Sequence, residues 1–158
     1  MSEGIVAEKS AGVHELTIER RFAAPPQQVF AAWTDPALLA GWFGPGEMTC
    51  PEVELDVREG GRWRTVMLET GGTRHIVAGT YVEIDPPRRL VMTWAWEQGG
   101  AFGNETLVEI DLEADGDGTL MHFRHSGFET VGAVEMHGHG WGATWPCLDA
   151  FIAEGKLG

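Results

Sequence analysis

The chain has 158 residues, of which 43% are hydrophobic, and this length predicts one domain whose core needs no disulfide or metal to hold it together. Asp and Glu total 24 against 11 Lys and Arg, so the formal net charge is -13, which disfavours nucleic acid and anionic membrane surfaces as partners. A leader pattern and a membrane-length apolar run are both lacking, and Cys50 and Cys147 lie far apart, so we expect a cytoplasmic protein. We expect residues 1–12 to be a flexible tail and residues 13–158 to be the single domain.

A strand and two short helices are the first predicted elements of this domain. From Val13 to Phe22 apolar and charged residues alternate, which is typical of a half-buried strand. Pro25 and Pro26 end the strand and fit the first turn of a helix. Asp35 followed by Pro36 combines an N-cap side chain with a proline at the first helical position, which predicts a second short helix.

Six further strands are predicted between about residue 52 and residue 125, where the two-residue alternation returns. Turn-forming segments divide this region at residues 59–61, 70–72, 85–87, 98–100 and 115–118. Short connections of this kind join antiparallel neighbours, so the six strands form a meander. On the last strand both sets of alternate residues include apolar side chains, so the pattern does not decide which set points inward.

A long helix is predicted over residues 130–154, where Trp141, Trp145, Leu148 and Ile152 recur at helical spacing. At 1.5 Å per residue such a helix would be about 35 Å long, enough to cross a sheet. Pro146 leaves two alternatives open, because proline inside a helix removes a donor and clashes with the preceding turn. Either the helix kinks there or it begins near Thr144.

Seven strands that share an apolar face need a cover, and the final helix is the one element large enough to provide it. We therefore predict an α+β helix-grip fold. In it, a curved antiparallel sheet of about seven strands surrounds a long C-terminal helix, with two short helices after the first strand. A curved sheet and a straight helix touch along only part of their length. The gap near the short helices is either filled by large side chains or left as a pocket.

The aromatic residues, seven tryptophans among them, decide between these two alternatives. Large rings can fill a closed core, or they can line a cavity that receives an apolar ligand. The number of indole N–H groups favours a cavity, where a ligand or water supplies partners. The predicted ligand-binding residues are Trp42, Phe43, Trp63, Met67, Trp94, Trp96, Phe123, His125, Trp141 and Trp145.

Catalytic and metal-binding signals are weak by comparison. His125 is the weak catalytic candidate, as a proton carrier in the cavity, and the alternative is a core histidine hydrogen-bonded to nearby backbone. Arg20 has inward parity, so it either holds a ligand carboxylate or pairs with a carboxylate of the protein. His137 and His139 stand two residues apart and point away from each other in a helix, so no metal site is predicted. No cofactor is expected either.

Several motifs together resemble one family over almost the whole chain. They are Trp33-Thr34-Asp35-Pro36, Gly41-Trp42-Phe43-Gly44-Pro45, Gly60-Gly61-Arg62-Trp63, the run from Gly79 to Leu90, and His125-Ser126-Gly127-Phe128. The chain is similar to the START-like (SRPBCC) helix-grip superfamily, and in particular to the subfamily resembling the C-terminal domain of activators of the heat-shock protein 90 ATPase. The resemblance implies the helix-grip fold and a cavity that relatives use for hydrophobic or polycyclic ligands.

The resemblance does not imply one function, because relatives include lipid and hormone carriers, polyketide cyclases, ligand-sequestering resistance proteins and co-chaperones. The leading hypothesis is binding of a hydrophobic or aromatic small molecule in the tryptophan-lined cavity. The alternatives are a cyclase- or hydrolase-like enzyme that uses the same cavity, and a stress-response or chaperone-associated interaction module. A homodimer and a chaperone partner are left open.

Overall fold

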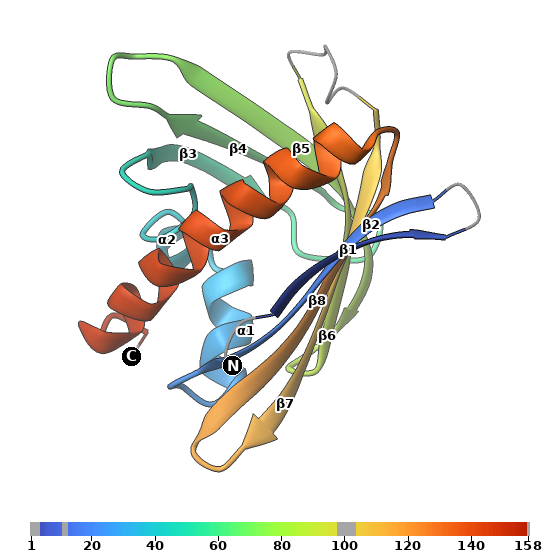
Figure 1. The fold of residues 1–158 in the computed structure, drawn as a ribbon. Coiled ribbons are helices and arrows are strands. Elements are labelled where there is room, and N and C mark those ends of the chain that lie inside the picture. The colour runs from blue at the N-terminus through green and yellow to red at the C-terminus, as the bar shows by residue number, and fades with distance from the viewer. Residues whose placement is uncertain (1–3, 11–12, 98–103, 158) are drawn as a thin grey trace.

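The computed structural model describes residues 4–10, 13–97 and 104–157. Within this part of the chain, eight strands form one antiparallel sheet with the order β1-β2-β8-β7-β6-β5-β4-β3 (Figure 1). The strands are β1 (Gly4–Ser10), β2 (Val13–Phe22), β3 (Thr49–Leu55), β4 (Arg62–Leu68), β5 (Arg74–Asp85), β6 (Arg89–Trp96), β7 (Thr106–Asp115) and β8 (Gly118–Phe128). Two short helices, α1 (Pro26–Thr34) and α2 (Pro36–Leu39), follow β2, and α3 (Val131–Ala153) ends the fold. The predicted helix-grip architecture is confirmed.

Strand β1 corrects the expectation of a tail over residues 1–12. Gly4–Ser10 pair antiparallel with β2, from Gly4 opposite Glu19 to Ser10 opposite Val13, so the tail prediction is wrong for these seven residues. Residues 1–3 and 11–12 lie outside the described residues. The strand satisfies backbone groups that would be unpaired if β2 were the edge of the sheet. Such pairing needs no side-chain pattern, so alternation could not reveal it.

The two short helices begin where their prolines and cap predict. Pro26 opens α1 after Pro25, and the side chain of Asp35 accepts a hydrogen bond from the Ala37 N–H at 3.0 Å at the start of α2. The indole of Trp42 then reaches back and donates to the Ala32 carbonyl at 3.1 Å. This bond fixes the end of α2 against α1, and Trp42 is buried there.

Helix α3 runs without interruption through Pro146, so the alternative start near Thr144 is wrong. Its N-cap is Thr130, whose hydroxyl oxygen accepts the Ala133 N–H at 3.0 Å. Its 23 residues span about 35 Å, and Figure 1 shows the helix lying across one face of the sheet. Close to the proline, the Gly46 N–H donates to the Ala143 carbonyl at 3.3 Å, which ties the loop after α2 to the helix. None of the described helices is both long enough and apolar enough to cross a membrane.

The core lies between the inner face of the sheet and the three helices. On β8, Met121, Phe123 and His125 face inward with exposed fractions of 0%, 2% and 0%, which settles the inward face of that strand. Trp145 of α3, with an exposed fraction of 1%, packs over Phe123 with ring centroids 5.1 Å apart. One end of the space between α3 and the sheet is therefore filled by side chains.

Candidate ligand pocket

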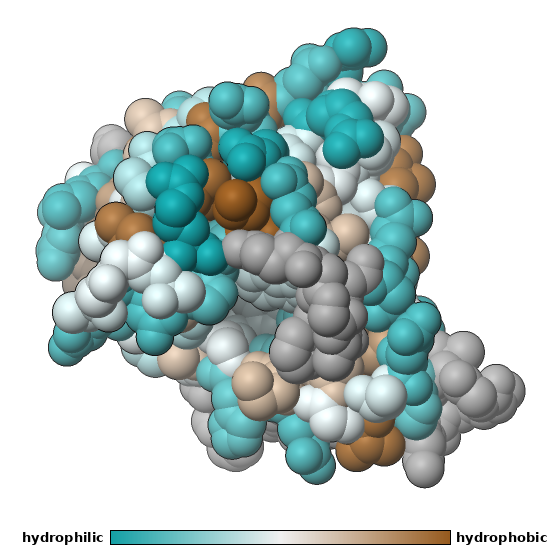
Figure 2. All heavy atoms as spheres, turned by 90° about the horizontal axis from the view of Figure 1, so that it is seen from above, coloured by the Kyte–Doolittle hydropathy of each residue, from teal (hydrophilic) through white to brown (hydrophobic). Residues whose placement is uncertain are grey.

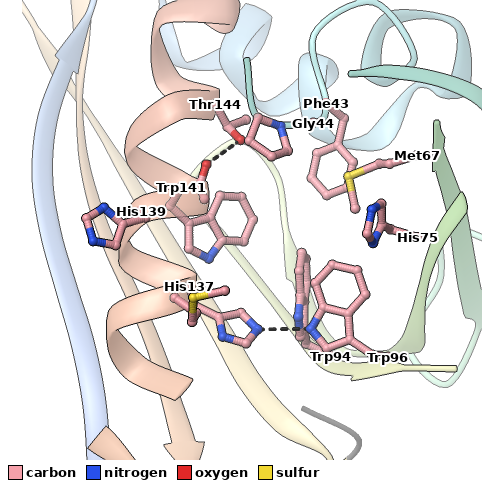
Figure 3. A pocket seen from close by; sticks show the side chains of 13 residues that line it. Phe43, Gly44, Met67, His75, Trp94, Trp96, His137, His139, Trp141 and Thr144 are labelled. Carbon is pink, nitrogen blue, oxygen red and sulfur yellow. Dashed lines mark hydrogen bonds between the residues drawn. The ribbon is translucent and has the colours of Figure 1, made fainter. Parts of the chain in front are cut away.

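A pocket of about 630 Å³ occupies the other end of the space between α3 and the sheet. Figure 2 views the molecule from the end where β4 joins β5 and shows its surface hollowed on this side, and Figure 3 shows the side chains around the pocket. The lining residues are Phe43, Gly44, Pro45, Met67, His75, Trp94, Trp96, Met136, His137, His139, Gly140, Trp141 and Thr144.

Helical and strand periodicity place the main walls of the pocket. His137, Gly140, Trp141 and Thr144 recur at spacings of three and four residues, so they share one face of α3. On the opposite wall, Trp94 and Trp96 are two residues apart on β6 and thus point to the same side of the sheet. Met67 of β4 and His75 of β5 continue that wall.

The loop after α2 forms the third wall, and glycine is required in it. Gly44 has a φ of 128°, a conformation that side chains with a Cβ rarely adopt. A Cβ at this position would also lie 3.3 Å from the Cβ of Met48 and 3.6 Å from the Sδ of Met67. The tight backbone lets Phe43 and Pro45 reach the pocket from either side of Gly44.

A hydrogen-bonded chain behind the pocket fixes the tautomer of His125. The Trp141 indole N–H donates to His125 Nδ1 at 3.1 Å, so this nitrogen carries no proton. His125 Nε2 must then carry the proton, which it donates to the Thr106 hydroxyl oxygen at 2.7 Å. That hydroxyl donates in turn to the Trp94 carbonyl at 3.0 Å. Every donor in the chain has one acceptor, and His125 is neutral.

A second tryptophan–histidine bond runs in the opposite direction between the layers. Trp96 of β6 donates its indole N–H to His137 Nε2 of α3 at 2.9 Å, shown as a dashed line in Figure 3. His137 Nδ1 lies 2.8 Å from the Ala133 carbonyl, which only accepts, so Nδ1 carries the proton of the neutral ring. Trp96 and His137 thus join the sheet to α3 at the wall of the pocket.

Burial keeps both histidines neutral. Desolvation lowers the pKa of His125 well below its ordinary value, and the neighbouring His137 ring lowers it further. Burial also lowers the pKa of His137, although the hydrogen bond to the Ala133 carbonyl acts in the other direction. A charged imidazole would have no free lone pair for the indole donor, so protonation of either ring would break a tryptophan bond.

Of the ten residues predicted to bind a ligand, five line the pocket: Phe43, Met67, Trp94, Trp96 and Trp141. The other five, Trp42, Trp63, Phe123, His125 and Trp145, are buried in the core and do not line it. The Trp63 indole donates to the Thr93 carbonyl at 3.1 Å, and the Trp145 ring stacks on Trp141 at 5.1 Å. Ligand contact by these residues stays a prediction.

Sequence reasoning did not propose His75, Met136, His137, His139, Gly140 or Thr144 as ligand-binding residues, nor the loop residues Gly44 and Pro45. Extending the helical spacing from Trp141 by three or four residues in each direction would have found His137 and Thr144.

Arg20 lies away from the pocket and bonds Asp149 of α3 at 2.9 Å, which fits the second of its two predicted roles. Cys50 is buried and its thiol has a pKa raised to about 11 by desolvation, so it is no nucleophile at neutral pH.

Several solved structures are similar to this fold. Protein NE0264 from Nitrosomonas europaea is 25% identical, with a TM-score of 0.78 over 95% of this chain and 100% of that chain. The AHSA1 protein SPO3351 from Silicibacter pomeroyi is 29% identical, with a TM-score of 0.77 over 88% of this chain and 97% of that chain. CalU16 from Micromonospora echinospora is 26% identical, with a TM-score of 0.70 over 99% of this chain and 88% of that chain.

No curated protein sequence matches the chain. A family model does: the one described as Activator of Hsp90 ATPase homolog 1-like protein matches residues 23–153. The match begins just before α1 and ends with the last residue of α3, so it includes the α3 wall of the pocket, the loop after α2 and all strands from β3 to β8. The chain therefore belongs to the family of activator of Hsp90 ATPase homolog 1-like proteins.

Proposed function

We propose that this protein binds a hydrophobic, aromatic small molecule in the pocket between the sheet and α3. One observation carries the proposal: three indoles, the ring of Phe43 and two methionine side chains surround about 630 Å³. Pockets for small molecules commonly measure roughly 300–1,000 Å³ and have mostly apolar walls with a few polar groups. Burial of an aromatic ligand against these rings would supply the driving force for binding.

A titration with a neutral aromatic probe, N-phenyl-1-naphthylamine, tests the proposal. Bound probe should quench tryptophan emission, because Trp94, Trp96 and Trp141 all line the pocket. It should also stabilise the fold, by about 2.7 kcal/mol at a hundred times its dissociation constant. Absence of both quenching and a thermal shift up to the solubility limit would contradict the proposal.

A glycine on the pocket face of α3 offers a variant that blocks the pocket and spares the fold. A Cβ at Gly140 would meet no atom within 4 Å outside the neighbouring helix backbone, so a side chain can start at this position without a clash, and we expect that of Gly140→Leu to extend into the pocket. The matched control is Gly132→Leu, because Gly132 lies on the same helix outside the pocket and its nearest atom is 3.9 Å away. Both variants should keep or raise stability, since leucine favours a helix more than glycine does. Binding should be lost in Gly140→Leu alone.

Catalysis in the same pocket draws no support from His125. Both of its ring nitrogens hold hydrogen bonds inside the fold, and its side chain is fully buried behind the pocket wall. The role of proton carrier therefore stays a prediction, tested by turnover in His125→Leu. Association with a chaperone likewise stays a prediction, tested by copurification.

A further inference from the structure

The indole N–H groups around the pocket are either hydrogen-bonded within the fold or buried. Trp141 donates to His125 Nδ1 at 3.1 Å, and Trp96 donates to His137 Nε2 at 2.9 Å. The Trp94 nitrogen is also buried, with no partner among the described residues, so it is not exposed to the pocket. The N–H edge of each indole, which carries partial positive charge, is therefore hydrogen-bonded or buried. The faces of the rings, which are electron-rich, remain to contact a ligand.

Two other polar side chains of the pocket wall, those of Thr144 and His137, are also engaged within the fold. The Thr144 hydroxyl donates to the Gly140 carbonyl at 2.8 Å, and His137 Nδ1 donates to the Ala133 carbonyl at 2.8 Å. Met67 and Met136 add thioether sulfur, which is a weak acceptor. Among the described lining residues, these side chains offer π electrons and sulfur, and the exposed His139 and His75 are the remaining side chains with a ring N–H.

The charge near the pocket is negative. Neither Lys nor Arg is among the described residues that line it. His75, at the wall, has its Nε2 2.8 Å from the Glu69 carboxylate, which places a negative charge next to the pocket. While His75 is neutral, Nε2 donates to Glu69 and Nδ1 is an acceptor. The protein as a whole carries a formal charge of -13, so its field attracts cations.

We infer that the ligand is an organic cation built on an aromatic ring system, such as a protonated aromatic amine or an N-alkylated heteroaromatic ring. The inference rests on the proposed function, since it names the ligand class of the same pocket. A cation over the face of an indole is attracted by the ring quadrupole, most strongly for tryptophan. An anion or a ligand recognised through carbonyl oxygens would need donors, and the described lining has neither Lys nor Arg and no indole N–H that is free to donate to a ligand.

Three probes of nearly equal shape separate charge from hydrophobicity: N-methylquinolinium (cation), 1-methylnaphthalene (neutral) and 1-naphthoate (anion). Calorimetric titration at about pH 8 keeps histidine side chains mostly neutral. The cation should bind tighter than both isosteres, by about tenfold relative to the anion, and its advantage should shrink as salt is added. Equal or tighter binding of the neutral or anionic probe would overturn the inference and leave the proposed function intact. If none of the three binds, both fail.

A charge placed at the pocket supplies the second test. Met136 lines the pocket and has an exposed fraction of 59%, so Met136→Lys should fold normally. It should weaken N-methylquinolinium binding by about tenfold and strengthen 1-naphthoate binding. The control is Val82→Lys, because Val82 is 52% exposed and does not line the pocket, while the change in net charge is the same. Equal effects of the two substitutions on cation binding would overturn the inference.

Discussion

The rings of His125 and His137 pack edge to face between the sheet and α3, with centroids 5.2 Å apart and ring planes at 79°. Each accepts an indole N–H from the opposite layer, His125 from Trp141 of the helix and His137 from Trp96 of the sheet. The two bonds therefore cross the interface in opposite directions. Both require neutral rings, so the attachment of α3 to the sheet depends on protonation.

Stability should fall as the solution becomes mildly acidic. Because the pKa of each of these histidines is lowered in the fold, the unfolded chain binds protons below about pH 6.5 that the folded chain does not. The free energy of unfolding should then decrease by up to about 1.4 kcal/mol per pH unit for each histidine, until pH reaches the lowered pKa. Urea unfolding at about pH 7.5 and about pH 5.5 measures the change. The variant His125→Leu should be less stable at the higher pH and show a smaller decrease, and an unchanged decrease would contradict the assignment.

Loss of the indole N–H should cost more at Trp141 than at Trp145. The two rings stack at 5.1 Å on α3 and both are buried, but only Trp141 has a hydrogen-bond acceptor, and Trp145 Nε1 has no partner among the described residues. Trp141→Phe leaves His125 Nδ1 without its donor, at a cost of about 1–3 kcal/mol beyond the lost volume. Trp145→Phe loses similar volume and removes an N–H that has no partner among the described residues, so it breaks no hydrogen bond there and is the matched control. Chemical denaturation of both variants measures the difference, and equal losses would show that the Trp141 bond contributes nothing net.

Gly79 should tolerate no side chain, although it lies in a strand. It pairs with Trp63 across β4 and β5, and a Cβ there would lie 1.9 Å from the Thr93 carbonyl oxygen and 2.7 Å from Trp63 Nε1. Gly79→Ala therefore has to displace either backbone or the Trp63 bond to Thr93, and we expect a loss of more than about 3 kcal/mol. Thermal unfolding checks this, with Gly140→Ala as a control that meets no atom within 4 Å. A small effect at Gly79 would mean that the strands can separate without strain.

Arg89 should stabilise the outer face of the sheet through three carboxylates. Its guanidinium lies 3.1 Å from Glu83, 3.0 Å from Glu109 and 2.7 Å from Asp111, and these bonds raise its pKa. Arg89→Leu leaves three negative charges close together, at a cost of about 1–2 kcal/mol. Added salt screens their repulsion, so the deficit should shrink as ionic strength rises. Unfolding at low and high salt measures this, and a deficit independent of salt would point to lost packing instead.

Most of the fold could be predicted from the sequence because the signals that start and end its helices and strands are local. The prolines before α1, the Asp35 cap and the two-residue alternation each act within a few residues. The sequence could not reveal β1, whose pairing uses backbone groups, or decide whether α3 passes Pro146. That second outcome depends on contacts with a distant loop, such as the bond from Gly46 to Ala143.

The pocket was harder to predict. The alternation along a strand tells which face of the sheet a side chain lies on, but not where along the axis of α3 it lies. Trp63 and Trp94 both point inward, yet only Trp94 lines the pocket. Trp63 is held against the sheet by its bond to the Thr93 carbonyl at 3.1 Å. Phe123 and Trp145 lie where the helix packs closely on β8, and only the tertiary structure shows where that packing ends.

The bond from the Gly46 N–H to the Ala143 carbonyl ties the loop after α2 to the helix at one end of the pocket. Near Thr144, the wall made by the α2 loop is fastened to the helix, so these two parts move together. Near His137, the helix is joined to β6 by the indole of Trp96 at 2.9 Å. Each end of the pocket is therefore fastened by one hydrogen bond to α3, so a ligand that needs a wider pocket has to break one of the two.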